Sequence, residues 1–161
     1  MKLFKKLAAA ALAAVLALSM VGCGVGGTGS AFNTKEEVLN YICEAYYTYG
    51  HGEKTANRDT TLDTPAADLI TAANQAAGKD VDAKLESAAK GDEFKDYVYS
   101  YEICTDLKTS VMKEYYLESL RIELRRKTNN ADEINIGAAT GKIGDKTYIV
   151  VMAKVVKPSS H

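Results

Sequence analysis

The chain has 161 residues, of which 47% are hydrophobic and 25% are charged, and its formal net charge at pH 7 is −1. This length is enough for one domain with a sizeable core. The balance of 20 basic against 21 acidic residues argues against nucleic-acid binding, which needs a basic stripe, and against electrostatic adhesion to anionic lipid.

The first 22 residues have the composition of an export signal. Three lysines precede an apolar run from Leu7 to Val21 that only Ser19 interrupts. A basic segment, an apolar segment and a small residue before the cleavage point are the parts of a secretory signal. The apolar run of about fifteen residues is shorter than the roughly twenty that a spanning helix needs, so we expect cleavage rather than a permanent transmembrane anchor.

Residues 18–23 resemble the lipobox of bacterial lipoproteins, in which a small residue precedes an obligatory cysteine. Gly22 and Cys23 match this pattern, whereas Met20 stands where leucine is usual. The resemblance implies that the Cys23 thiolate is lipidated and that acyl chains such as palmitate hold the protein on the extracytoplasmic side of the cell membrane. The alternative is a secreted protein that is cut nearby, with Cys23 an ordinary cysteine.

Cleavage would leave a lipidated cysteine on a tether, followed by one domain. Residues 23–33 are rich in glycine and serine, a composition typical of a flexible linker, and residues 34–157 make up the domain. Loss of the three signal lysines leaves 17 basic against 21 acidic residues, a net charge of −4.

Two further cysteines, Cys43 and Cys104, allow a disulfide in an exported protein. It would close a loop of about sixty residues and contribute about 4 kcal/mol in the chain-entropy model. Two buried thiols that pack as small apolar groups are the alternative. No pair of closely spaced cysteines or cysteine–histidine cluster indicates a zinc site, and we expect no cofactor.

The first half of the domain is predicted to be helical. A capping box from Thr34 to Glu37 begins a helix that Gly50 ends. A polar loop is expected over His51–Asp63. Thr64 and Pro65 then begin a second helix, as N-cap and first helical residue, which ends at Gly78, and residues 81–89 form a short third helix.

The second half alternates strands with one long helix. Residues 97–104 alternate with a period of two and predict a strand with an aromatic face, Tyr97, Tyr99 and Tyr101. Residues 107–126 predict a helix whose apolar side consists of Val111, Met112, Tyr115, Tyr116, Leu120 and Leu124. Residues 133–139 and 147–156 form a hairpin around a turn at 141–146, and the second of these strands is apolar enough to be central. The chain is therefore predicted to be α+β, with helices packed on a small antiparallel sheet.

The C-terminal hairpin, Ile134–Ala139 followed by Thr147–Met152, resembles the closing hairpin of the CAP superfamily, also called SCP domains. The strand with Glu102 resembles the family's GENIA segment, and residues 112–126 are similar to its AWMNSPGHRANIL helix. The resemblance implies an α-β-α sandwich with Glu102 in a cleft. Of the family's two histidines and two glutamates, only Glu102 has a match, and Ile122 stands near the second histidine position. A domain of this kind would be degenerate and would bind rather than catalyse.

No catalytic constellation stands out, so we predict no catalytic residue and no metal site. His51 is more consistent with a solvated loop residue than with a ligand, because a metal site needs three or four ligands, and His161 ends the chain. The tyrosine face is either core or a platform for glycan or peptide, and the cations of 121–127 either hold an anionic polymer or form a charged helix end.

We therefore expect a non-enzymatic protein of the cell envelope, attached to the membrane by lipid. It would work by binding or display, with a protein or cell-envelope ligand as its partner and no nucleic acid. A lipoprotein of another small α+β fold that binds a peptide, glycan or envelope partner is the alternative, and a cell-wall hydrolase is a third.

Overall fold

The computed structural model describes residues 35–46, 54–104 and 110–157, with side chains from Glu114 onward in the last range. The expected signal, the lipidation site Cys23, the tether and both histidines lie outside the described residues. In chain order, the elements are α2 (Lys35–Ala45), β1 (Thr55–Arg58), the 3₁₀ helix η1 (Thr60–Leu62), α3 (Asp63–Gln75), α4 (Val81–Ala88), the 3₁₀ helix η2 (Asp92–Phe94), β2 (Val98–Ile103), α5 (Ser110–Lys127), β3 (Glu133–Ile143) and β4 (Lys146–Val155).

The strands form one mixed sheet in the order β1-β3-β4-β2. The three strands expected from the sequence pair antiparallel, with β4 between β3 and β2, which confirms its predicted central position. The prediction of a purely antiparallel sheet is wrong, because β1 pairs parallel to β3. This strand lies within the predicted loop, and its sequence, Thr-Ala-Asn-Arg, is too short and too polar to give a strand signal.

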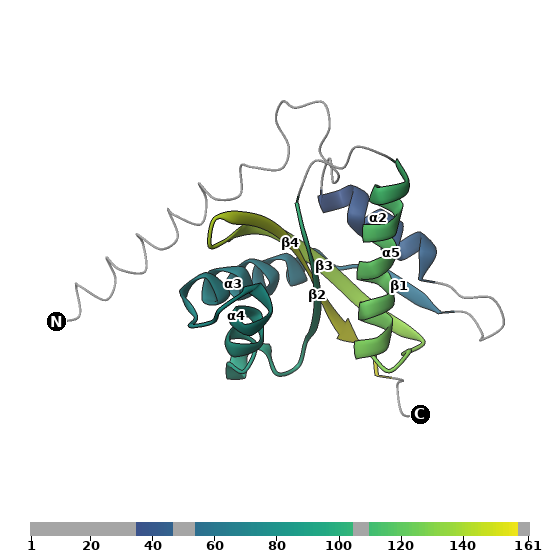
Figure 1. Cartoon of the computed structure of the whole chain (residues 1–161). Helices are drawn as coiled ribbons and strands as arrows, with labels where there is room; N and C mark the ends of the chain where they lie inside the picture. The colour runs from purple at the N-terminus through teal and green to yellow at the C-terminus, as the bar shows by residue number, and fades with distance from the viewer. Residues whose placement is uncertain (1–34, 47–53, 105–109, 158–161) are drawn as a thin grey trace.

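Helices cover both faces of the sheet, so the domain has three layers (Figure 1). Ile149, Val151 and Ala153 of β4 pack into a cluster with α2 and α5. The alternating residues of the same strand, Tyr148, Val150 and Met152, pack into a second cluster with α3 and α4. Burial of both faces explains the unbroken apolar run that was read from the sequence.

The helix predictions hold in outline and fail in detail. The third helix, α4, is confirmed. The second, α3, begins at Asp63 and not at Thr64, and it ends at Gln75 before the expected stop at Gly78. On α5, the prediction that Tyr115 is apolar core is wrong, because 72% of its surface is exposed, whereas the overlooked Leu117 is 6% exposed. Leu120 and Leu124 are buried as expected.

The hairpin is longer than predicted, because Gly141, which suggested the start of the turn, lies in the strand. β3 continues to Ile143, and Gly141 pairs with Tyr148. The turn consists of Gly144, which has a φ of 69°, and the residue after it. At Gly137, a Cβ atom would lie 2.6 Å from the Cβ of Leu62 in η1. Glycine is needed there because η1 crosses close to the strand.

The carboxylate of Asp63 connects four elements. Its Oδ2 accepts hydrogen bonds from Lys35 Nζ of α2 at 2.6 Å and from Arg58 Nη2 of β1 at 2.7 Å. Its Oδ1 accepts from the amide of Ala138 in β3 at 2.9 Å. Burial alone would raise the pKa of this carboxyl, but the hydrogen bonds from Arg58, Lys35 and Ala138 hold it below its ordinary value. The ionised form is therefore the one that the fold stabilises.

We predict that Asp63→Asn lowers the free energy of unfolding at pH 7 by about 2 kcal/mol, because hydrogen bonds to a charged acceptor contribute about 1.5–3 kcal/mol. The contribution of Asp63 is fully present above its unfolded pKa of about 3.9 and is lost as the pH falls through its lower folded pKa. In urea unfolding measured between pH 2 and pH 7, the free energies of unfolding of the parent protein and of Asp63→Asn should therefore converge at acid pH.

Asp68 of the same helix provides the control. Burial and the nearby charge of Glu93 raise the pKa of its carboxyl, so the fold disfavours the ionised form. Asp68→Asn should be neutral or stabilising at pH 7. Equal losses in the two variants would contradict the role assigned to the Asp63 carboxylate.

Candidate functional site

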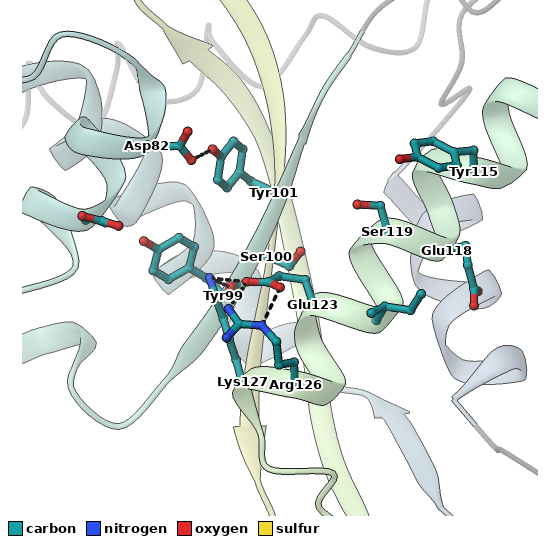
Figure 2. Close-up of a pocket in the computed structure, with 12 residues that line it drawn as sticks. Asp82, Tyr99, Ser100, Tyr101, Tyr115, Glu118, Ser119, Glu123, Arg126 and Lys127 are labelled. Atoms are coloured by element: carbon teal, nitrogen blue, oxygen red, sulfur yellow. Dashed lines mark hydrogen bonds and ion pairs between the residues drawn. The ribbon is translucent and has the colours of Figure 1, made fainter.

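A groove of about 540 Å³ follows the outer edge of β2, between α4 and α5 (Figure 2). Three elements line it: Asp82 and Glu86 come from α4, Tyr99, Ser100 and Tyr101 from β2, and Tyr115, Glu118, Ser119, Ile122, Glu123, Arg126 and Lys127 from α5. Because α4 covers one face of the sheet and α5 the other, the groove spans the thickness of the sheet at its edge strand.

The register of α5 presents one set of side chains to the groove and another to the core. Tyr115, Ser119, Ile122 and Arg126 are spaced by four, three and four residues, so they share one face of the helix. Ile122 is 52% exposed and Tyr115 is more exposed still. A helix face that leaves isoleucine and tyrosine in solvent beside a groove is a feature of binding surfaces.

The wall of the groove on the α4 side is built from tyrosines and carboxylates. The Tyr101 hydroxyl donates a hydrogen bond to Asp82 Oδ1, and its ring meets the ring of Tyr148 edge to face at 6.0 Å. Burial, with the hydrogen bond to Asp82 second, raises the pKa of Tyr101 well above its ordinary value. Burial and the charges of Glu86 and Asp82 also raise the pKa of Tyr99. Both phenols therefore remain neutral donors at physiological pH.

Lys127 closes one end of the groove. Its Nζ donates to the backbone carbonyl of Tyr99 at 2.8 Å and lies 4.3 Å from the centre of the Tyr99 ring. It also lies 3.5 Å from Glu123 Oε1, to which Arg126 donates at 2.7 Å. The hydrogen bond from Arg126 holds the pKa of Glu123 below its ordinary value.

The basic cluster at the end of α5 is largely neutralised within the helix. Besides the pairs to Glu123, Arg121 donates to Glu118, and this bond lowers the pKa of that carboxyl. Arg125 lies over the ring of Tyr46 at 5.9 Å. Of the two interpretations of residues 121–127, the structure therefore favours the charged helix end over a site for an anionic polymer.

Glu102, the predicted cleft residue, lies beside the groove and is not one of its lining residues. Its half-buried carboxyl accepts a hydrogen bond from the Ser119 hydroxyl, which does line the groove. Burial raises its pKa, against the hydrogen bonds from Ser119 and from the backbone of Ile103.

The tyrosine face combines both roles considered for it. Tyr97, Tyr99 and Tyr101 all pack against the cluster under α3 and α4, and two of them also line the groove. Sequence reasoning did not identify Asp82 and Glu86 as members of this site, and it placed Ile122 only near a histidine position of the CAP superfamily. The available signal was that Tyr115 and Ile122, seven residues apart, lie on the same face of a helix.

Cys43 and Cys104 are both half-buried and pack against the same cluster under α2 and α5. Burial, partly offset by the charge of Arg58, raises the pKa of the Cys43 thiol, so little reactive thiolate is present at neutral pH. The disulfide remains a prediction.

The described residues contain no cluster of three or more histidine, cysteine, aspartate and glutamate side chains that could hold a metal ion. Within the same ranges, no helix is both long and apolar enough to cross a membrane. No protein-family model matches the chain, and no match was found among curated proteins or solved structures. Any assignment of function therefore rests on the residues of the groove.

We predict that Tyr101→Phe lowers the free energy of unfolding by about 1 kcal/mol at pH 7, because it removes the hydrogen bond to Asp82. A raised folded pKa gives stability that is fully present below the unfolded pKa of about 10 and is lost as the pH rises above it. Denaturation between pH 7 and pH 12 should therefore show a shallower alkaline decline for the variant. Tyr115→Phe, at an exposed ring, is the control; an equal effect there would contradict the assignment.

Proposed function

We propose that the protein is a membrane-anchored extracytoplasmic lipoprotein whose α+β domain acts by binding a ligand in the groove between α4, β2 and α5. The observation that carries the proposal is the lining of this groove. It combines exposed apolar side chains, Tyr115 and Ile122, with neutral phenols and ionised carboxylates. Such a mixture of apolar surface and a few convergent polar groups is typical of ligand sites.

The electrostatics of the groove favour binding over glycoside hydrolysis. A glycosidase needs one carboxylic acid with a raised pKa to protonate the leaving group. Arginine partners instead hold the pKa values of Glu118 and Glu123 below their ordinary range. Burial does raise the pKa of Glu102, but this carboxyl is not among the residues that line the groove. The two carboxylates that α5 contributes are therefore ionised acceptors, suited to holding a ligand in place.

A degenerate CAP-like domain is the form of scaffold that we propose. Helices on both faces of the sheet and the position of Glu102 beside α5 support it. Ile122, which stands near the position of a family histidine, supports loss of the metal chemistry, because an exposed isoleucine in the groove offers a contact and no ligand atom.

The photochemical test of binding uses the lipoprotein in living cells. We predict that p-benzoylphenylalanine in place of Ile122 forms a covalent adduct on irradiation, because this position is exposed inside the groove. The same replacement of Glu44, an exposed residue of α2 outside the groove, is the matched control. Gel electrophoresis reports the adduct, and its absence at 122, or the same adduct at both positions, would contradict the proposed site.

The anchor is tested separately. We predict that Cys23→Ser moves the protein from the detergent phase to the aqueous phase in Triton X-114 partition, because it removes the acyl chains that hold it at the membrane. Cys43→Ser should partition like the parent protein. Retention of the Cys23→Ser variant in the detergent phase, or an intact mass without lipid in the parent, would refute the anchor.

A further inference from the structure

The outer edge of β2 carries backbone groups that point into the groove. The amide of Cys104 donates to the carbonyl of Thr147 at 2.8 Å. In an antiparallel pair of strands, every second residue directs its backbone N–H and C=O groups toward the partner strand. Ser100 and Glu102 therefore also direct their backbone groups toward β4, where they pair with Val151 and Ile149. The backbone groups of the residues between them point away from the sheet.

The contact made by Lys127 confirms this orientation. Its Nζ reaches the carbonyl of Tyr99 from outside the sheet, so odd-numbered residues of β2 face outward. Among the described residues, the outward N–H and C=O groups of Tyr101 have no backbone partner. The amide of Ile103 donates to the carboxyl of Glu102. The groove thus contains a strand edge at which Lys127 occupies the carbonyl of Tyr99, Glu102 occupies the amide of Ile103, and, within the described ranges, the outward groups of Tyr101 between them are open.

A strand added at this edge would place its side chains alternately on the two faces of the sheet. Side chains on the face of Tyr99 and Tyr101 would meet Asp82 and Glu86 of α4. Side chains on the opposite face would meet Ser119 and Ile122 of α5 (Figure 2). The two walls therefore differ: the α4 wall is acidic and aromatic, whereas the α5 wall combines exposed apolar and hydroxyl groups with charged side chains that are paired along the helix.

The carboxylates of the acidic wall determine which ligand side chains would fit on the face of Tyr99 and Tyr101. Glu86 is exposed and no cation within the described ranges pairs with it. Asp82 accepts only the Tyr101 hydroxyl there. A lysine or arginine of a ligand would meet these carboxylates, because the cation–π contact of Tyr99 is already made by Lys127 and neutralises neither of them.

We propose that the groove binds an extended peptide by strand addition to β2, in a segment where basic and apolar residues alternate. This inference rests on the proposed binding function of the groove. Backbone hydrogen bonds to the N–H and C=O groups of Tyr101 supply affinity, and the two walls select the alternate side chains. A glycan, like a peptide, can bind to tyrosine rings and carboxylates, but it has no backbone amides that could pair with β2.

The test uses the full mature lipoprotein in dodecyl maltoside micelles. The probe is a pool of seven-residue peptides with lysine or arginine at odd positions and valine, isoleucine or leucine at even positions. Saturation with the pool should slow amide hydrogen exchange of Tyr101 by at least about tenfold. The amides of Ser100 and Glu102, which already bond to β4, should change little. Unchanged exchange at the Tyr101 amide overturns strand addition.

Backbone methylation of the peptides provides a second readout. The amides of either the odd-numbered or the even-numbered peptide residues face β2 in an added strand, so methylation of that set should weaken binding by at least about tenfold. Methylation of the other set should leave binding unchanged. Equal effects of the two sets overturn the proposal.

Charge reversal tests the acidic wall. Glu86→Lys should weaken binding of the pool by about three- to tenfold, and Glu44→Lys should leave it unchanged. Equal weakening in the two variants, or none in Glu86→Lys, overturns the assignment of the basic residues.

Two further outcomes separate this proposal from the binding function. If chitohexaose binds the groove and the peptides do not, strand addition is wrong, while the proposed binding function stands. If the outward amides of β2 become protected with rising protein concentration and no ligand, the edge belongs to a second copy of the chain, and the peptide proposal is overturned.

Discussion

The carboxylate of Asp63 is the interaction on which the arrangement of layers depends. It is the first residue of α3, and it receives hydrogen bonds from α2, β1 and β3. These elements belong to all three layers, so one side chain fixes where α2 and α3 lie relative to the parallel edge of the sheet. Two cations and a backbone amide around one carboxylate hold its geometry while burial opposes its charge.

The groove arises at the opposite edge of the sheet. There, α4 and α5 flank β2 from the two faces, and no further strand of the described residues fills the space between them. The groove surface is a mixture of two environments, because α4 contributes carboxylates and α5 contributes exposed apolar groups beside its paired charges. The proposed binding site needs no residues beyond those that the helices and the edge strand leave outside the core.

The sequence predicted the elements whose apolar side chains repeat with a regular period. It missed the features that depend on contacts between distant segments of the chain. The central strand β4 was evident from its unbroken apolar run, and α4 and the buried leucines 120 and 124 of α5 followed from helical spacing. Strand β1 was missed because four residues with one apolar side chain carry no period. Gly141 suggested an early turn, although it is glycine because α3 approaches β3 closely there. Tyr115 was assigned to the core because the amino-acid type cannot tell a core face from a groove face.

Of the groove, the sequence predicted the tyrosine face of β2 from its period of two. The expectation that Glu102 lies in a cleft came from the resemblance to the CAP superfamily, and the structure places Glu102 beside the groove. The sequence could not predict Asp82 and Glu86, which join the site only through the packing of α4 across the sheet edge. Long-range contacts of this kind leave no local pattern.

On the lipid-anchored protein that we propose, an open strand edge would be a hazard as well as a binding site. Lipid anchors would confine many copies to the plane of the membrane and raise their effective concentration, which favours edge-to-edge pairing of exposed strands. Two features oppose such pairing: α4 and α5 rise on either side of β2, and Lys127 occupies the carbonyl of Tyr99. The two helices thus obstruct the approach of another copy's sheet edge, whereas a single extended segment can enter between them. The same geometry that protects the edge from other copies makes it selective for a narrow, extended ligand.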